Sequence, residues 1–594
     1  MKKPILTIQD WDTGIADDPY KGFQLVKNLN ENMEGIASCG FVSYKTSFDT
    51  QPTIYINADP DTDVITTYSD AGLTTPASWL TGNSVTYANL VAVYFTGADL
   101  PAGITAGTIY YTNYVSSSTL KLSPTRQAVG TSYVDITDAG SGNRTMSIAL
   151  LGNVTQIAKD DRTGFWFAVD SAGKVWSTEI SYDRFVLVDG NTQTAASGNG
   201  IAVWKDYVIV FRNNKIDTYG PLSSAIASRA WTNDWQTTAT TTATLGSHNA
   251  LNSINDKLYF CDGNKISSIM ENSGQTFAPG TAGTFTYSTN ALDLPDNYTA
   301  VELEDYGGYL AIAATSNRRS YIFPWDRVSS SFNFPVEIPE TSIHSLVSIN
   351  NILYAVTNSR AAVYATNLSS VNLVRRIPNH LNNTSYPANG VIDIISSAKM
   401  GGRLYLGIRA GDAITSAAGN TGVYSLDVQT GRLRTVTTLS NGLTSTTQYV
   451  GAIGQLGQFN DGTPYYFFFY YGTMGGVDMV IAQHPYTNYE SQIISPIYQA
   501  STDTFESTPI TKAIFYFQIP IGGSDAVKLE YREYDTQTWI ELGEVTASTK
   551  KADQSPMIEM NFHAYVTQVQ FRVSIKSNNT TGSTFVRLKK VDIF

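Results

Sequence analysis

The sequence predicts an all-β protein whose central part is a β-propeller, and three observations carry that prediction. One short apolar run recurs seven times between residues 163 and 471, with starts about 43 to 62 residues apart. Turn-forming residues bound the copies, and a second apolar run soon follows the first in several periods. No stretch reads as a long helix. A repeat of this length with several strands in each period is typical of propellers.

The repeated runs are rich in β-branched and aromatic residues, so each predicts a short strand buried on both faces. A four-stranded blade cannot bury both faces alone, whereas blades stacked in a ring bury one another. The alternative is a long two-sheet solenoid or a string of sandwiches. The hairpin recurs at the same place in every period, which favours seven blades over residues 149–486, although the spacing at 408–422 and 440–463 leaves six or eight open. The seven runs occupy residues 163–170, 206–212, 256–262, 308–314, 351–357, 402–408 and 464–470.

Residues 1–50 predict an N-terminal β-hairpin segment, with strands at 23–29 and 36–45 on either side of a turn. A ring of blades made from one chain has to be closed at some point. We therefore expect a strand from the N-terminus to complete the last blade.

Residues 51–148 predict a small β domain inserted before the propeller, because they are rich in Thr, Ser, Gly and Asp and lack the blade repeat. Residues 487–594 predict a C-terminal β-sandwich of roughly 100 residues. The strands expected in the inserted domain lie at 53–57, 85–87, 91–95, 108–115, 119–122 and 144–148. Those expected in the sandwich lie at 510–518, 527–534, 538–542, 557–561, 565–576 and 584–593.

The composition argues against several classes of protein. Charged residues make up 15% of the chain, where about 25% is usual. The net charge is −12 and no basic run exceeds two residues, so tight nucleic-acid binding is not expected. No apolar stretch reaches the length of a membrane span, and Asp10 and Asp12 interrupt any signal core. Cys39 and Cys261 are too few for a disulfide framework and predict buried thiols in a protein made in a cytoplasm.

One acidic turn has the spacing of calcium ligands. Asp59, Asp61 and Asp63 alternate with other residues, and Asp70 holds the twelfth position counted from Asp59. An EF-hand requires Gly at the sixth position, which is Val64 here, and the segment lies among expected strands. We interpret it as a solvated acidic turn, with a site for one calcium ion as the alternative.

The remaining motifs predict no catalytic, cofactor-binding or metal-binding residue. Residues 170–176 approach an Asp-box, but they lack the Thr before Trp176 and occur once, so a blade turn is the better interpretation. Propeller glycosidases need converging paired carboxylates, which the sequence does not reveal. No nucleophile elbow, zinc-protease or phosphate-loop motif is present. The histidines show no ligand spacing: His248, His344, His380, His484 and His563.

Two further features have an ordinary structural interpretation. The pairs Arg318–Arg319 and Arg375–Arg376 predict solvated loop or interface residues and not a phosphate site. The aromatic run at 465–471 predicts a central blade strand, with a sugar-stacking site as the alternative.

Residues 100–111, 116–123 and 134–142 together resemble a small β-module found repeatedly in structural proteins of tailed phages. They read Leu-Pro-Ala-Gly-Ile-Thr-Ala-Gly-Thr-Ile-Tyr-Tyr, Ser-Ser-Ser-Thr-Leu-Lys-Leu-Ser and Val-Asp-Ile-Thr-Asp-Ala-Gly-Ser-Gly. The resemblance covers about 50 residues. The order of the parts is also similar to that of hub and nozzle proteins of short-tailed phages, which form hexameric rings around the DNA channel.

This resemblance implies a non-enzymatic structural protein of a phage tail, made in the host cytoplasm and located in the virion. It implies a homo-oligomeric ring, a hexamer in the hub and nozzle proteins, with tail or connector proteins as neighbours and DNA passing without tight binding. The acidic balance agrees, because carboxylates repel phosphates. One alternative is a receptor-binding tail tip or fibre protein that recognises host surface glycans. Another is a propeller glycosidase or depolymerase, since fold alone does not decide function.

Overall fold

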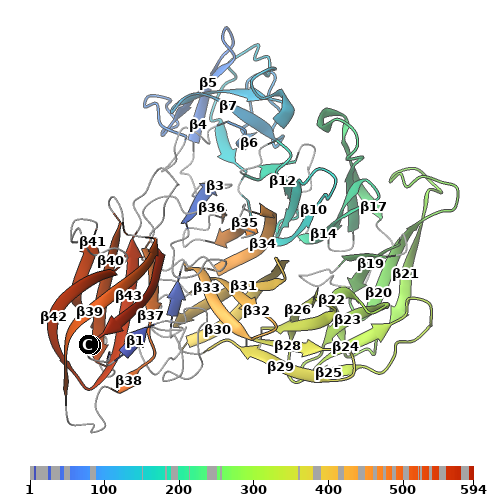
Figure 1. The fold of residues 1–594 in the computed structure, drawn as a ribbon. Coiled ribbons are helices and arrows are strands. Elements are labelled where there is room, and N and C mark those ends of the chain that lie inside the picture. The colour runs from blue at the N-terminus through green and yellow to red at the C-terminus, as the bar shows by residue number, and fades with distance from the viewer. Residues whose placement is uncertain are drawn as a thin grey trace.

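The structure, a computed structural model, consists of three β-rich bodies, which are a propeller, a barrel and a sandwich (Figure 1). Its described residues are 4, 6–8, 25–27, 40–45, 54–79, 89–149, 151–180, 184–188, 198–212, 215–236, 251–254, 257–358, 361–378, 390–412, 421–438, 449–458, 464–471, 477–483, 490–499, 507–519, 521, 525–533, 538–546, 557–576 and 587–594.

The propeller has seven blades, each a four-stranded antiparallel sheet. Blade one contains β10 (Val154–Lys159), β11 (Trp166–Asp170), β12 (Val175–Ser177) and β13 (Val186–Leu187); blade two contains β14 (Gly198–Trp204), β15 (Tyr207–Arg212), β16 (Lys215–Gly220) and β17 (Ala230–Gln236). Blade three contains β18 (Leu251–Ile254), β19 (Lys257–Asp262), β20 (Lys265–Glu271) and β21 (Phe285–Asp293); blade four contains β22 (Thr299–Tyr306), β23 (Tyr309–Thr315), β24 (Ser320–Trp325) and β25 (Val336–Ile338).

Blade five contains β26 (Ile343–Ile349), β27 (Ile352–Thr357), β28 (Ala362–Thr366) and β29 (Val371–Arg376); blade six contains β30 (Gly390–Met400), β31 (Arg403–Asp412), β32 (Gly422–Asp427) and β33 (Arg432–Thr438). Blade seven contains β34 (Tyr449–Gln458), β35 (Pro464–Tyr471), β36 (Val477–Gln483) and, from the N-terminal segment, β3 (Gly40–Lys45). The first strands contact one another in turn from β10 to β34, and β34 contacts β10, which closes the ring.

The predicted propeller with seven blades is confirmed, and the repeated runs of the sequence all form second strands. These strands lie between two neighbours in each sheet, so they are the most deeply buried part of each blade. In β23, for example, Leu310 through Ala314 are fully buried. Continuous apolar runs are what a strand covered on both faces requires.

An N-terminal strand completes the last blade, as expected, but the predicted hairpin is wrong. β3 pairs with β36 in blade seven, whereas β2 (Leu25–Lys27) pairs with β37 (Glu490–Ile494) in the sandwich. Both strands lie inside the predicted segments. Their partners are more than 400 residues away along the chain, and sequence proximity had suggested that they pair with each other.

The inserted segment forms a closed six-stranded barrel in the order β4-β5-β8-β7-β6-β9. Trp79, Phe95 and Leu120 are fully buried in its core. Its strand β5 was not expected from the sequence, and the strand expected at 85–87 lies outside the described residues. The strands are β4 (Ile54–Asp59), β5 (Val64–Tyr68), β6 (Ala92–Thr96), β7 (Tyr110–Ser116), β8 (Thr119–Ser123) and β9 (Thr145–Ile148).

The C-terminal sandwich has two sheets, ordered β1-β44-β39-β42 and β2-β37-β43-β40-β41, and β38 also pairs with β43. The N-terminal segment therefore supplies one strand to each sheet. The remaining strands are β1 (Leu6–Ile8), β38 (Tyr498–Gln499), β39 (Thr508–Ile519), β40 (Ala526–Glu533), β41 (Ile540–Thr546), β42 (Met557–Val566), β43 (Gln568–Lys576) and β44 (Arg587–Ile593).

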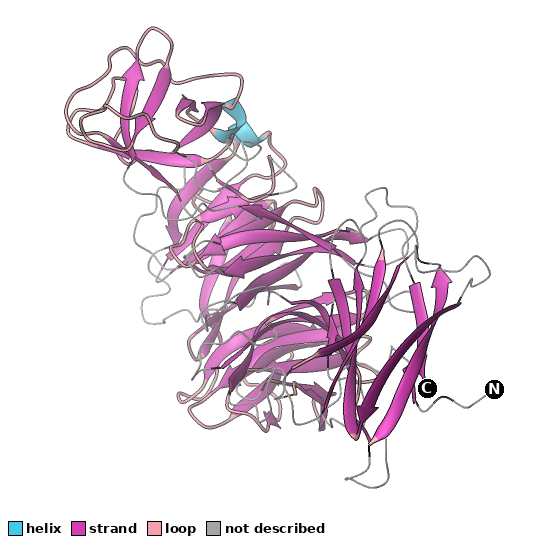
Figure 2. Cartoon of the chain, turned by 90° about the vertical axis from the view of Figure 1, so that its left-hand side faces the viewer, coloured by secondary structure: helices cyan, strands magenta, loops and turns pink. Residues whose placement is uncertain are grey.

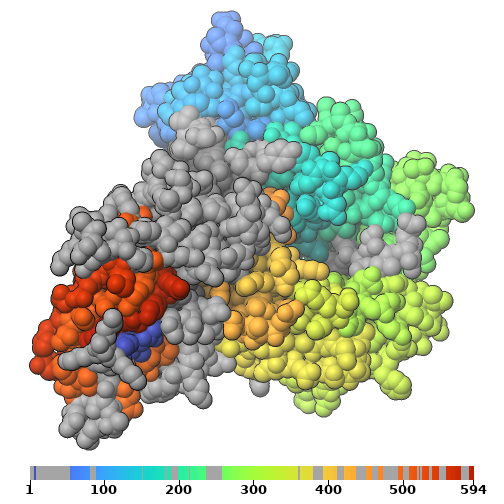
Figure 3. All heavy atoms as spheres, in the orientation of Figure 1, coloured from blue at the N-terminus to red at the C-terminus, as the bar shows by residue number. Residues whose placement is uncertain are grey.

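The barrel and the sandwich project from different parts of the propeller (Figures 2 and 3). One apolar cluster joins the sandwich core, including Phe515 and Phe571, to Tyr354 of blade five and Leu404 of blade six. The barrel lies beside blade one. Among the described residues, two short 3-10 turns are assigned, η3 (Arg126–Ala128) and η4 (Ile226–Ser228), and no helix could span a membrane.

Candidate functional site: the junction between barrel and propeller

A buried arginine of the barrel anchors it to the propeller. Arg126 opens η3, directly after β8, and is 1% exposed. Its Nη1 donates to Ser177 Oγ at 2.5 Å, and its Nη2 donates to Glu179 Oε2 at 2.5 Å and to Tyr219 OH at 2.9 Å. Ser177 ends β12 of blade one and Tyr219 lies in β16 of blade two, so one barrel side chain touches two blades.

Glu179 is the acceptor at the centre of this junction. Its Oε2 also accepts a hydrogen bond from Ser177 Oγ at 2.9 Å, and its Oε1 accepts one from Arg229 Nη1. Arg229 follows η4 and also donates to the carbonyls of Leu222 and Ser224. Both oxygens of the buried carboxylate are therefore bound by guanidinium groups. A buried charge is tolerated only when it is paired and hydrogen-bonded in this way.

Apolar contacts extend the junction. Tyr111 of β7 shares a buried cluster with Trp176, Phe185 and Phe469 of blades one and seven, and its hydroxyl donates to Leu187 O at 2.9 Å. Apolar packing and a buried ion network therefore both connect the barrel to the propeller.

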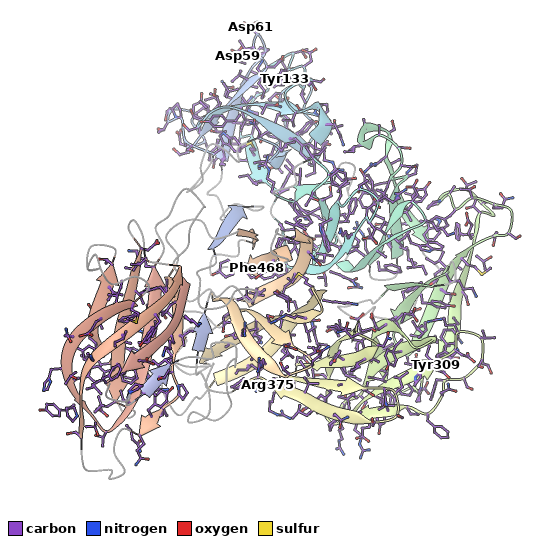
Figure 4. All side chains as sticks on the ribbon, viewed as in Figure 1. Asp59, Asp61, Tyr133, Tyr309, Arg375 and Phe468 are labelled. Atoms are coloured by element: carbon purple, nitrogen blue, oxygen red, sulfur yellow. The ribbon has the colours of Figure 1, made fainter. Side chains whose placement is uncertain are left out.

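The carboxylates of the acidic turn in the barrel do not converge on one point where a calcium ion could bind. Asp59 Oδ1 accepts the backbone N–H of Asp61, and its Oδ2 accepts the Thr62 hydroxyl. Asp63 Oδ1 instead accepts Ile136 N, and Asp70 caps a separate turn through the N–H groups of Thr74 and Thr75. These hydrogen bonds lower the pKa values of Asp59 and Asp70. In Figure 4, Asp59 and Asp61 lie at the tip of the barrel that points away from the propeller.

Asp170 organises a blade turn. It is fully buried, its Oδ1 accepts the N–H groups of Ala172 and Lys174, and its Oδ2 accepts Trp176 Nε1 at 2.9 Å. Burial raises the pKa of its carboxyl. The geometry agrees with the interpretation as a structural turn, because its described partners stabilise the link between β11 and β12.

The other residues singled out in the sequence are scattered. His344 lies in β26 and His563 in β42, while His248, His380 and His484 lie outside the described residues. Within the described ranges, no three His, Cys, Asp or Glu side chains form a group that could hold a metal ion. Cys261 is buried in β19, and Cys39 lies outside those ranges.

Residues of the two arginine pairs form ion pairs within their blades, and the aromatic run forms a buried blade strand. Arg319 lies near Glu337, at 3.6 Å, and Arg376 donates to Glu340 at 3.0 Å. Residues 466–469 of β35 are buried, and Figure 4 shows Phe468 inside blade seven, which fits a core strand.

Sequence reasoning did not identify the Arg126 network. The two arginines lie 50 to 93 positions along the chain from the side chains of Ser177, Glu179 and Tyr219 that they bind, so no local motif links them. One weak signal exists. Residues 51–148 contain three basic residues, Lys121, Arg126 and Arg144, and two of them prove to be buried. A rare cation in a weakly charged module is a candidate for a structural ion pair.

Comparison with known proteins assigns no family to the chain. No protein family model matches the chain, and no curated protein matches it. Among solved structures, the Cps50 (Swd1) β-propeller domain of Myceliophteria thermophila is 11% identical, with a TM-score of 0.37, over 55% of this chain and 96% of that one. The WD40 propeller domain of Doa1 is 9% identical, with a TM-score of 0.34, over 57% and 94%. The Dos1 propeller is 9% identical, with a TM-score of 0.35, over 56% and 93%. Each of these three solved structures is described as a propeller.

Proposed function

We propose that this protein is a non-enzymatic structural component of a bacteriophage tail, of the hub or nozzle type. In this proposal it works as a homo-oligomeric ring in the virion, beside other tail or connector proteins. The observation that carries the proposal is the buried Arg126–Glu179–Arg229 junction, which makes the phage-like module a rigid arm of the propeller. An arm fixed in this way can hold the geometry that a closed ring requires.

The charge distribution supports a passage role in this proposal. The chain has an excess of acidic residues and no long basic run, so it would not retain DNA that moves through a ring. The propeller and sandwich share one apolar core, which adds a second fixed body for contacts with neighbours.

Phage assembly with a truncated chain tests the proposal. We expect deletion of residues 52–147 to leave the propeller folded, because Glu179 keeps Arg229 as its partner. Incorporation into particles should fall strongly, since the arm is lost. Gel analysis of purified particles measures this, and circular dichroism of the isolated variant checks its fold. Normal incorporation and normal infectivity would contradict an assembly role for the barrel.

The proposal includes the absence of hydrolase activity. Purified protein incubated with host surface polysaccharide should release no reducing ends. Release that disappears in a Glu302→Gln variant would instead identify a glycosidase, because Glu302 is the carboxyl that lines the central cavity in the described part of the chain.

A receptor-binding role is the second candidate, and the outer face of the sandwich favours it. Tyr565 on β42 is 59% exposed and stacks edge-to-face with His563 at 5.0 Å. Exposed aromatic rings of this kind can stack on sugars. If this role holds, Tyr565→Ala should reduce adsorption of particles to host cells without changing the amount of protein in the particle.

A further inference from the structure

The inner strands of the propeller share an irregularity. In β22, Ala300 pairs with Ala314 and Glu302 pairs with Ala313, so Val301 is an extra residue that forms a β-bulge. Among the described residues, six of the seven inner strands carry such an interruption at a corresponding level of the blade. The extra residues in four of the other strands are Thr155, Asn199, His344 and Ile395, and in β34 the two residues Gly451 and Ala452 oppose the single residue Phe469. Bulges re-aim side chains and are over-represented next to binding sites.

Several of these bulges meet at one cavity in the centre of the ring. The cavity has a volume of about 390 Å³ and is lined by residues of β10, β22, β26, β30 and β34. This volume falls within the range of small-molecule sites, about 300–1,000 Å³. It lies at the end of the channel where several inner strands begin, close to the point at which the chain enters the propeller from the barrel.

Of the four hydroxyl groups of Thr155, Ser345, Ser396 and Ser397 in the wall, three donate within the protein. Thr155 Oγ1 donates to Gly198 O at 2.9 Å, and Ser396 Oγ donates to Val450 O at 3.5 Å. The hydroxyls of Ser345 and Ser397 share one hydrogen bond at 2.5 Å. A hydroxyl has one hydrogen and two lone pairs, so these groups retain mainly acceptor capacity for a ligand.

Glu302 adds a carboxyl to this wall. Its side chain accepts one long hydrogen bond, from Leu303 N at 3.3 Å, and no ion pair to it occurs in the described part of the chain. Glu302 is half-buried and faces the cavity. Burial, and then the nearby charge of Glu304, raise the pKa of Glu302 well above its usual range.

We propose that this cavity binds an organic cation, a primary ammonium or guanidinium group, which pairs with Glu302. An ammonium group has three donors and no acceptor, which complements the carboxylate of Glu302 and the lone pairs of the hydroxyl groups of Thr155 and Ser396. The charge of the ligand compensates a carboxylate that otherwise has no counter-ion. Such a cation can be a free amine or a lysine or arginine side chain of a partner protein, and both present the same chemistry to the site.

A neutral polyol fits this wall less well. Sugar hydroxyls bring no positive charge to compensate the carboxylate of Glu302. The other titratable or charged groups near this carboxyl are Glu304 of the same strand and His344 of β26, with Lys399 of β30 acting on Glu304. Binding of a cation therefore favours the ionised form of Glu302 and releases its proton, whereas binding of a neutral sugar does not.

Isothermal titration calorimetry of the full-length protein tests the inference with three probes: n-butylamine, the blocked tripeptide Gly-Lys-Gly and methyl glucoside. We expect both amines to bind with a dissociation constant of about 1 mM or lower. Affinity should rise with pH, and comparison of two buffers should show proton release. Glu302→Gln should weaken amine binding at least tenfold while the protein stays folded, because the amide removes a buried charge and keeps the shape. The matched control Glu337→Gln, in exposed β25 of the same blade, should bind like the wild type.

The two amine probes separate the sources of the cation. Tighter binding of the tripeptide than of n-butylamine supports a partner side chain, and the reverse order supports a free amine. Binding of methyl glucoside alone, equal binding by wild type and Glu302→Gln, or no binding by either amine would overturn the inference. The inference does not depend on the proposed tail function, so its failure would leave that proposal standing.

Discussion

At the scale of single residues, the buried carboxylates of the propeller differ in how well their charge is compensated. Glu179 is stabilised because two guanidinium groups bind its two oxygens. Glu302 and Glu304 lie on the inner strand β22 with little compensation, and burial dominates the pKa of both. A buried carboxylate therefore behaves differently at the two places. At the junction between barrel and propeller it is paired with cations, whereas in the central cavity Glu302 has no counter-ion among the described residues.

Arg126→Ala should loosen the junction. Removal of one partner from a buried ion network costs about 3 kcal/mol, because Ser177, Tyr219 and Glu179 lose the hydrogen bonds from Arg126 and the buried carboxylate loses one of its two guanidinium partners. The rate of limited proteolysis between barrel and propeller should then rise roughly a hundredfold. Arg162→Ala is the control, since Arg162 is 52% exposed and its surface pairs contribute about 0–1 kcal/mol. Equal rates in the two variants would show that Arg126 does not hold the barrel.

Glu304→Gln should change how stability depends on pH. Burial is the main cause that raises the pKa of Glu304 to about 7, from 4.5. The folded protein then binds more protons than the unfolded chain between these values, so stability falls as pH rises through this window. At pH 8 the variant should melt at a higher temperature than the wild type, and its free energy of unfolding should be larger by at most about 3 kcal/mol. At pH 4 the two proteins should be equally stable. The amide still accepts the hydrogen bond from Ser348 N.

Thermal melts at the two pH values measure the effect of Glu304→Gln. Glu337→Gln serves as its control, because Glu337 lies on the exposed outer strand of the same blade. A variant that is less stable than the wild type at pH 8 would show that the charge of Glu304 is compensated in the folded protein.

At the scale of elements, local pattern was a good guide to strands and a poor guide to pairing. The seven repeated runs all form second strands, because a strand covered on both faces needs a continuous apolar run. Strand β5, with the alternating residues Val64–Tyr68, followed an acidic turn and was not recognised. The pairing of β2 and β3 with strands more than 400 residues away carries no local signal, so a hairpin was the natural but wrong prediction. The Arg126 network was not predicted either, because Arg126 and its partners are also far apart in the sequence.

Strand β3 should be essential for closure of the ring. Val42 pairs with Ile481 in the ladder between β3 and β36, and β3 is the outermost strand of blade seven. Val42→Pro removes a backbone N–H and puts a proline ring into the ladder between β3 and β36, so it should destabilise blade seven. The thermal midpoint should fall well below that of Val42→Ala, which keeps the backbone donor. Equal midpoints would mean that closure by β3 contributes little to stability.

At the scale of the whole molecule, the N-terminal segment ties the bodies together. β1 and β2 complete the two sandwich sheets and β3 completes the propeller, so 45 residues join both bodies. The barrel, which follows directly in sequence, is fixed to blade one by Arg126 and Tyr111. The propeller therefore carries two further bodies, and the proposed role in assembly relies on both.

The central claim is that the protein is a structural part of a phage tail, and a reconstruction of purified phage particles by electron microscopy tests it most directly. The account predicts several copies in a closed ring on the tail axis. In each copy the seven-bladed propeller, with its barrel and sandwich attached as in Figure 1, should fit the density as one body. Mature particles that lack the full-length protein altogether would contradict the account.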